Sequence, residues 1–192
     1  MLQPLKPTLE FYSAQIDALL NKALNDPDHR LSWLTLGSVD HSDQQGAPDL
    51  RTVVLRDFSP ERTLLFYTDA RSPKTSQFQL NSNACVLLFD HESMMQLRIY
   101  GTVIVDTHST QCLKIRDTLP LNSKHNYNTA KAPGTSLPSV SPIHQTDQLH
   151  FALLHFYSKT FDLLHLRKEG AVRIQAINGS KRSLKQLQWI TP

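Results

Sequence analysis

Residues 51–101 read RTVVLRDFSPERTLLFYTDARSPKTSQFQLNSNACVLLFDHESMMQLRIYG, and they contain the strongest indications of the fold class. It contains short runs rich in β-branched, aliphatic and aromatic residues, which are typical of strands. SPER (59–62) is a short connection, so the runs at 50–58 and 62–69 are predicted to form a hairpin. A second short connection joins two further runs in the same way, at 84–90 and 96–106.

Helical patterns flank these runs instead of alternating with them. Apolar residues recur at three- and four-residue steps in 8–24, which predicts an amphipathic helix. SPKTSQFQLN (72–81) predicts a short helix with Ser72 as its N-cap, and 109–119 predicts another. Because the strands follow one another, we predict a mainly β protein, an antiparallel split β-barrel with peripheral helices. The remaining strand-like runs are 31–39, 149–158, 161–167, 171–177 and 184–190.

Composition limits the class of protein. The 192 residues fit a single domain, 1–192, and 40% hydrophobic with 19% charged residues is ordinary for a globular chain. The formal net charge is +3 without a long basic run, so we expect no nucleic-acid partner. The N-terminus lacks the design of a signal peptide, and no stretch approaches the roughly 18 apolar residues of a membrane span. We therefore expect a soluble cytoplasmic protein with no membrane partner.

Residues 120–149 differ in character from the rest of the chain. They hold four prolines and many serine, threonine and asparagine residues, which predicts a long loop within the domain. Loops of this length are usually functional or mobile. We expect it to form either a lid or a partner surface.

Side chains must hold any phosphate that this protein binds, because neither G-x-G-x-x-G nor a P-loop motif occurs and there are only 6 glycines. Arg51, Thr68, Ser72 and Lys74 could together form a phosphate cradle, with Lys74 in the first turn of a predicted helix. Charge-assisted hydrogen bonds of this kind contribute about 1.5–3 kcal/mol each. From spacing alone, ordinary surface cations at strand and helix ends are the simpler interpretation.

Two further positions are candidates for contacts with a ring. Gln96 opens the strand QLRIYG, and its amide can both donate to and accept from the polar edge of a heteroaromatic ring. Arg51 opens and Arg56 ends the strand RTVVLR, so the two point to opposite faces and serve different groups. Taken alone, Gln96 is more simply interpreted as an ordinary edge-strand residue.

Metal and hydrolytic chemistry have no support in the sequence. His91, Glu92, His150 and His155 fit no standard metal-ligand spacing, so we predict no metal site. There is no G-x-S-x-G motif, and no carboxylate pair stands out. We assign no catalytic acid, base or nucleophile.

Five segments in chain order resemble one family, the pyridoxamine 5′-phosphate oxidase-like proteins, which bind flavin mononucleotide (FMN) in a split barrel. The match covers most of the chain, and a divergent branch of the family is the most similar. The segments are RTVVLR (51–56), FYTDARSPK (66–74), QLRIYG (96–101), FYSKTFDLLHLR (156–167) and WITP (189–192).

The resemblance implies FMN as the cofactor and a role for each matching residue. Arg51 and Lys74 would grip the FMN phosphate, helped by Thr68 and Ser72. The next strand residues would lie along the isoalloxazine ring; they are Thr52, Val53, Val54, Leu55 and Arg56. Tyr67 and Gln96 would belong to the same site, and Tyr157 and Arg167 would reach the flavin from the second subunit of a homodimer.

Most departures from the family pattern fall on the substrate side, and one, at Pro73, removes a contact with the FMN phosphate. Leu163 stands where the family has an arginine that faces the substrate, while Arg56 and His165 remain as candidate substrate contacts. Pro73 also replaces an arginine beside Lys74. The resemblance thus implies an FMN-dependent oxidoreductase acting on an unidentified small molecule. The alternative is a flavin-binding module without turnover, serving as a carrier, store or sensor.

Overall fold

The computed structural model describes residues 7–25, 30–41, 45–140, 142–179 and 183–192, and a single antiparallel sheet dominates this part of the chain. The strands are β1 (Trp33–Asp40), β2 (Ala47–Phe58), β3 (Thr63–Asp69), β4 (Asn83–Asp90), β5 (Met95–Asp106), β6 (Phe151–His165), β7 (Val172–Asn178) and β8 (Leu184–Ile190).

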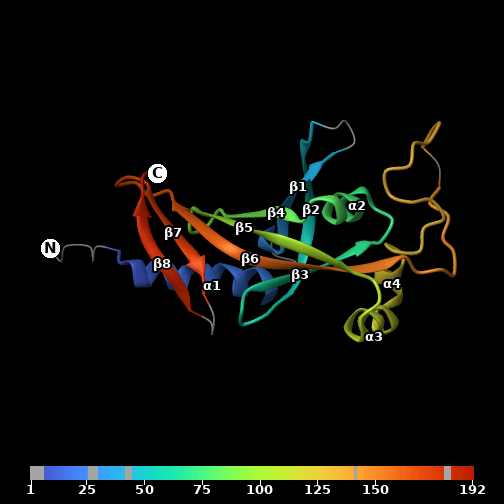
Figure 1. Cartoon of the computed structure of the whole chain (residues 1–192), viewed down its shortest axis with the longest axis horizontal. Coiled ribbons are helices and arrows are strands. Elements are labelled where there is room, and N and C mark those ends of the chain that lie inside the picture. Colours follow the sequence, from blue (N-terminus) through green and yellow to red (C-terminus); the bar gives the residue numbers. More distant parts are fainter. Residues whose placement is uncertain (1–6, 26–29, 42–44, 141, 180–182) are drawn as a thin grey trace.

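The sheet closes on itself. Its strand order is β3-β2-β1-β4-β5-β6-β7-β8, and β3 also pairs with β6, from Thr63↔Tyr157 to Asp69↔Phe151. Six strands therefore form a closed antiparallel barrel, and β7 and β8 continue the sheet beyond it (Figure 1). The predicted mainly β barrel with peripheral helices is confirmed.

The strand β6 corrects one prediction. We predicted separate strands at 149–158 and 161–167, whereas Phe151–His165 is one continuous strand. Its first half pairs with β3 and its second half with β7, while β5 pairs with it on the other side along almost its whole length. The register shifts at Tyr100/Gly101, where a Cβ on Gly101 would collide with the carbonyl oxygen of Tyr157. This long strand joins the barrel to the β7–β8 extension.

The predicted loop 120–149 is also more structured than expected. It begins with a short helix, α4 (Leu121–Lys124). Further on, Thr129 and Gln145 form an antiparallel bridge, and the Ala130 amide donates to the His144 carbonyl at 2.7 Å. The segment therefore returns on itself as a hairpin-like arm, at the far right of Figure 1.

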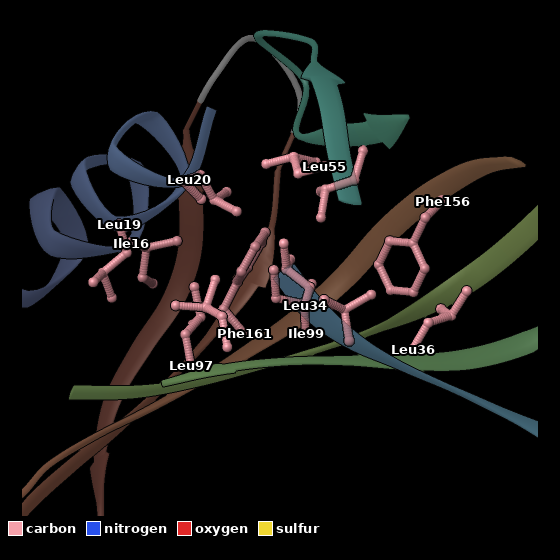
Figure 2. Packing of buried hydrophobic residues seen from close by; sticks show 14 of the residues in the cluster. Ile16, Leu19, Leu20, Leu34, Leu36, Leu55, Leu97, Ile99, Phe156 and Phe161 are labelled. Carbon is pink, nitrogen blue, oxygen red and sulfur yellow. The ribbon is translucent and has the colours of Figure 1, made fainter. Parts of the chain in front are cut away.

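Helices cover the barrel at three places. α1 (Leu9–Asn25) packs its buried face, which includes Ile16, Leu19 and Leu20, against the barrel core (Figure 2). α2 (Pro73–Leu80) follows β3 directly, α3 (Thr110–Thr118) follows β5, and a 3₁₀ turn spans Arg30–Ser32. In the described part of the chain, no helix is long and apolar enough to cross a membrane.

Candidate functional site

A lysine and two hydroxyl groups meet where β3 ends and α2 begins. Lys74 Nζ lies 3.2 Å from Thr68 Oγ1 and 3.1 Å from Ser72 Oγ, and the two hydroxyl oxygens are 3.1 Å apart. Thr68 and Ser72 are buried. Ser72 occupies the predicted N-cap position, but its side chain makes no capping hydrogen bond and turns to Lys74 instead. We call these three residues the lysine–hydroxyl cluster.

Among the residues that the structure describes, the charge of Lys74 has no direct counter-ion. No carboxylate of the described residues lies within ion-pair distance of Lys74, whose hydrogen-bond partners are the two hydroxyl groups. Burial, and then the charge of Arg51, lower the pKa of Lys74 below its ordinary value. A partly buried cation beside two hydroxyl donors is a fitting environment for a phosphate, which accepts charge-assisted hydrogen bonds from all three.

Arg51 reaches the same region from β2. It lies in the middle of this strand and not at its start, because β2 already begins at Ala47. Its Nη1 donates to Ser38 Oγ at 2.7 Å, and its Nη2 donates to Gln77 Oε1 at 2.9 Å. Gln77 and Lys74 are three residues apart on α2 and therefore share a helix face. This helix face brings Arg51 and Lys74 into one site.

Three further residues of this region were not predicted from the sequence. Gln77 and Ser38 are buried and hydrogen-bonded to each other at 2.6 Å, and Asp49 Oδ2 accepts from Arg51 Nη2 at 2.5 Å. Two signals were available. Asp49 precedes Arg51 by two residues and so points to the same face of β2, and Gln77 follows Lys74 by one helical step.

The outer face of β2 presents alternate residues of the predicted ring-binding strand. Val53 and Leu55 are buried in the barrel core, whereas Thr52 and Arg56 are exposed and Val54 is half-buried. A side chain on the outer face of β2 can contact a ring, while Val53 and Leu55 can offer only backbone groups there. The pairing of β2 with β3 shifts register between Leu55 and Asp57, so Arg56 lies at an irregularity in β2.

Arg56 borders a small cavity next to this outer face. The guanidinium carbon of Arg56 lies 5.4 Å from the centroid of the Tyr67 ring. The cavity measures about 320 Å³, and Ser123 and Tyr127 from the predicted loop region also line it. Burial raises the pKa values of Tyr67 and Tyr127, so both phenols stay protonated at neutral pH. The cavity thus combines one cation with two phenol rings.

Three predicted flavin contacts lie apart from the lysine–hydroxyl cluster within one chain. Gln96 is at the start of β5. α2 lies near the other end of β5, where the Val103 amide donates a hydrogen bond to the Ser82 carbonyl. Tyr157 shares the outer face of the β3–β6 pair with Tyr67, because the pairs Thr63↔Tyr157 and Tyr67↔Leu153 have the same parity. Arg167 follows the far end of β6.

His165 and Leu163 are also distant from Arg56. His165 and Leu153, which pairs with Tyr67, are 12 residues apart in β6, or about 40 Å of extended chain. His165 Nδ1 lies 2.9 Å from the Tyr12 hydroxyl of α1, and burial, then Arg167, lower the pKa of His165. Leu163 is fully buried in the barrel core.

Among the described residues, no group of three or more potential ligands is arranged to hold a metal ion.

A comparison with protein families finds one match at this site. The family described as "Pyridoxamine 5′-phosphate oxidase, FMN-binding domain" matches residues 13–107. This range includes Arg51, Thr68, Ser72, Lys74 and Gln96. Tyr157, His165 and Arg167 lie outside it.

Curated relatives match over a third to a half of the chain. The pyridoxine/pyridoxamine 5′-phosphate oxidase of Leptospira interrogans is 39% identical over 70 residues, which are 36% of this chain and 31% of that protein. The corresponding enzyme of Deinococcus deserti is 35% identical over 97 residues, 50% of this chain and 41% of that protein. The matched segments therefore span less than half of these relatives.

Solved structures match over nearly the whole chain. A pyridoxamine 5′-phosphate oxidase-related, FMN-binding protein from Nostoc punctiforme has a TM-score of 0.71 and 23% identity, covering 93% of this chain and 96% of its own. PhzG from Burkholderia lata, solved with tetrahydrophenazine-1-carboxylic acid, has a TM-score of 0.68 and 13% identity, covering 100% and 98%. At these identities the two structures show a shared fold.

The closed barrel and the phosphate-compatible cluster at its end define an FMN-binding split-barrel protein. The chain belongs to the pyridoxamine 5′-phosphate oxidase-like family, as the five matching segments predicted, and the cofactor of this domain is FMN.

Proposed function

We propose that this chain is an FMN-dependent oxidoreductase that acts on a small molecule bound in the cavity beside Arg56. The observation that carries the proposal is the position of this cavity next to the outer face of β2, where the flavin ring is expected. A flavin-binding module without turnover needs no substrate cavity beside the flavin ring. An oxidoreductase needs one, because its substrate must approach the ring.

Each residue has a distinct part in this proposal. Lys74, Thr68 and Ser72 hold the phosphate, and Arg51 adds a second cation from β2. Thr52, Val54 and Arg56 flank the ring on the outer face of β2. FMN, when bound, supplies the electron-transfer chemistry, and the protein supplies position and electrostatics.

The cavity favours a flat substrate with one anionic group. Arg56 is the only cation among its described lining residues, and Tyr67 and Tyr127 offer ring faces and phenol donors. Ile115 and Leu119 add apolar groups to the lining. A single guanidinium pairs well with a carboxylate, whereas a phosphate is usually held by several donors. This arrangement supports an aromatic carboxylate more than pyridoxine 5′-phosphate.

The proposal includes a homodimer with shared flavin sites. Gln96, Tyr157 and Arg167 are separated from the lysine–hydroxyl cluster within one chain, and Tyr157 is 42% exposed. A second copy could bring Tyr157 and Arg167 to the flavin without any change of fold. A lone subunit would then hold an incomplete site.

The test is reduction and reoxidation of the FMN-loaded protein in the absence of oxygen. NADH or NADPH should reduce the flavin and bleach its absorbance. A panel of aromatic carboxylates, including a phenazine carboxylate, should contain a compound that either reoxidises the reduced flavin or reduces the oxidised flavin. Arg56→Gln should slow the reaction with the carboxylate by a larger factor than it weakens FMN binding. Flavin that binds at one per subunit but reacts with none of these compounds would favour the carrier or sensor alternative.

A further inference from the structure

A carboxylate, that of Asp49, lies inside the proposed phosphate site. Its Oδ2 accepts a hydrogen bond from Arg51 Nη2 at 2.5 Å and another from Gln77 Nε2 at 2.9 Å. Gln77 Oε1 in turn accepts from Ser38 and from Arg51, which fixes the orientation of the amide. Asp49 is therefore held in place by two donors that belong to the site itself.

These contacts occupy the guanidinium of Arg51. Nη1 donates to Ser38 Oγ at 2.7 Å and to the Leu36 carbonyl at 3.4 Å, and Nη2 donates to Asp49 and Gln77. Within the described residues, each of the four terminal N–H groups of Arg51 thus has an acceptor. A phosphate oxygen can receive one of them only if it replaces an acceptor that is already present.

Asp49 is the acceptor that can leave at the lowest cost. Its side chain is 42% exposed and can be solvated by water once it is released. Ser38 and Gln77 are buried and bonded to each other, so displacing either would leave an unpaired buried polar group. An arriving phosphate would therefore replace Asp49 both at Arg51 Nη2 and at Gln77 Nε2, so that the buried Gln77 amide keeps an acceptor.

Asp49 also changes the net charge that a phosphate meets. The hydrogen bond from Gln77, then the charges of Arg51 and Lys74, hold the pKa of Asp49 below its ordinary value, so the carboxyl is ionised at neutral pH. With Asp49 charged, the site carries one net positive charge from Arg51, Lys74 and Asp49 instead of two. A phosphate monoester carries about −1.5 to −2 charges, so it is less well neutralised.

We propose that Asp49 is a competing anion within the FMN-phosphate site, which holds Arg51 in the free protein and lowers the affinity for FMN relative to a site without it. The role is specific to the phosphate: riboflavin, which has the same ring and no phosphate, neither displaces Asp49 nor is repelled by it. Asp49 thereby makes FMN easier to exchange and reduces the preference for FMN over riboflavin. This inference rests on FMN binding at the lysine–hydroxyl cluster.

The experiment compares FMN and riboflavin binding in three forms of the flavin-free protein by quenching of flavin fluorescence. Asp49→Asn keeps the shape and an oxygen acceptor for Arg51 while removing the charge. Glu61→Gln is the matched control, because it makes the same change of charge at an exposed position in the β2–β3 connection, 12 residues from Asp49. We expect Asp49→Asn to bind FMN on the order of tenfold more tightly, with riboflavin binding unchanged and Glu61→Gln like the wild type.

Two results would overturn the proposed role of Asp49 without overturning FMN binding by the wild type. The first is an Asp49→Asn protein that is folded, as its thermal unfolding curve shows, and binds FMN as tightly as the wild type or more weakly. The carboxylate would then be a structural support for Arg51. The second is equal tightening for riboflavin. A wild-type protein that binds no FMN would overturn the phosphate site together with the role of Asp49.

Discussion

The two ends of the flavin-binding region are built in different ways. At the proposed phosphate end, Thr68, Ser72, Lys74 and Gln77 come from a strand and the helix that follows it directly, so a stretch of ten consecutive residues, 68–77, contains all four. At the other end, the matching motif lies in the second half of β6, where Leu163 and His165 face the core and α1. The local motif at 66–74 therefore predicted side chains that the structure brings together, whereas the distal motif predicted substrate-side residues that lie against the core and α1.

The largest expected effect comes from restoring the family arginine at the distal end. Leu163→Arg places a charge in the fully buried core without a partner, so we expect a loss of about 3–5 kcal/mol in the free energy of unfolding. Denaturant unfolding of the flavin-free protein measures it. Leu163→Met is the control and should cost less than about 1.5 kcal/mol. If Leu163→Arg is as stable as the wild type, the side chain reaches solvent or substrate, and the contrast between the two ends disappears.

The next effect tests the phosphate end. Lys74→Ala and Arg51→Ala should each weaken FMN binding more than tenfold, or by more than about 1.4 kcal/mol, because each removes a cation from the phosphate. Riboflavin binding should change little. Titration with both flavins separates loss of the phosphate contact from loss of the whole site. Unchanged FMN affinity in both variants would remove the phosphate cluster from the proposal.

A mixed dimer tests whether the two ends meet across subunits. One chain carries Lys74→Ala with Arg51→Ala, and the other carries Tyr157→Ala with Arg167→Ala. In a random mixture half of the dimers are mixed, and each has one site with all four residues intact. We therefore expect about a quarter of the sites to regain tight FMN binding, whereas each variant alone should have none. If mixing restores nothing, the distal residues act within their own chain or not at all.

The smallest effect is a dependence on pH. Lys74 must be protonated to bind phosphate, and its pKa is lowered in the free protein by burial and by Arg51. Phosphate contacts raise the pKa of Lys74 in the complex. FMN affinity is therefore highest below the pKa of the free protein and falls as pH rises through it, with a slope that approaches about tenfold per pH unit. FMN titrations at increasing pH measure the slope. Lys74→Arg should give a flatter profile, because an arginine stays protonated over this range.

The sequence predicted most elements and missed where distant strands pair. Hairpins 50–58/62–69 and 84–90/96–106 follow from short connections, and all four are strands of the barrel. The pairing of β3 with β6, which closes the barrel, joins Thr63 to Tyr157 and has no local signal. The prediction of a break in β6 failed because Ser158–Thr160 lacks strand-like apolar character, while pairing with β5 and β7 holds these residues extended.

The sequence alone determined the class of this protein. The strand and helix patterns, the five segments in order and the residues of the lysine–hydroxyl cluster all lie in short stretches, where local spacing fixes which side chains share a face. The tertiary structure decided the rest. It placed Asp49 and Gln77 at Arg51, and it turned Leu163 and His165 toward the core and α1. The two-residue spacing of Asp49 and Arg51 already places both on one face of β2. The contact of Gln77 with Arg51 and the positions of Leu163 and His165 depend on how β2, β6, α1 and α2 pack in three dimensions.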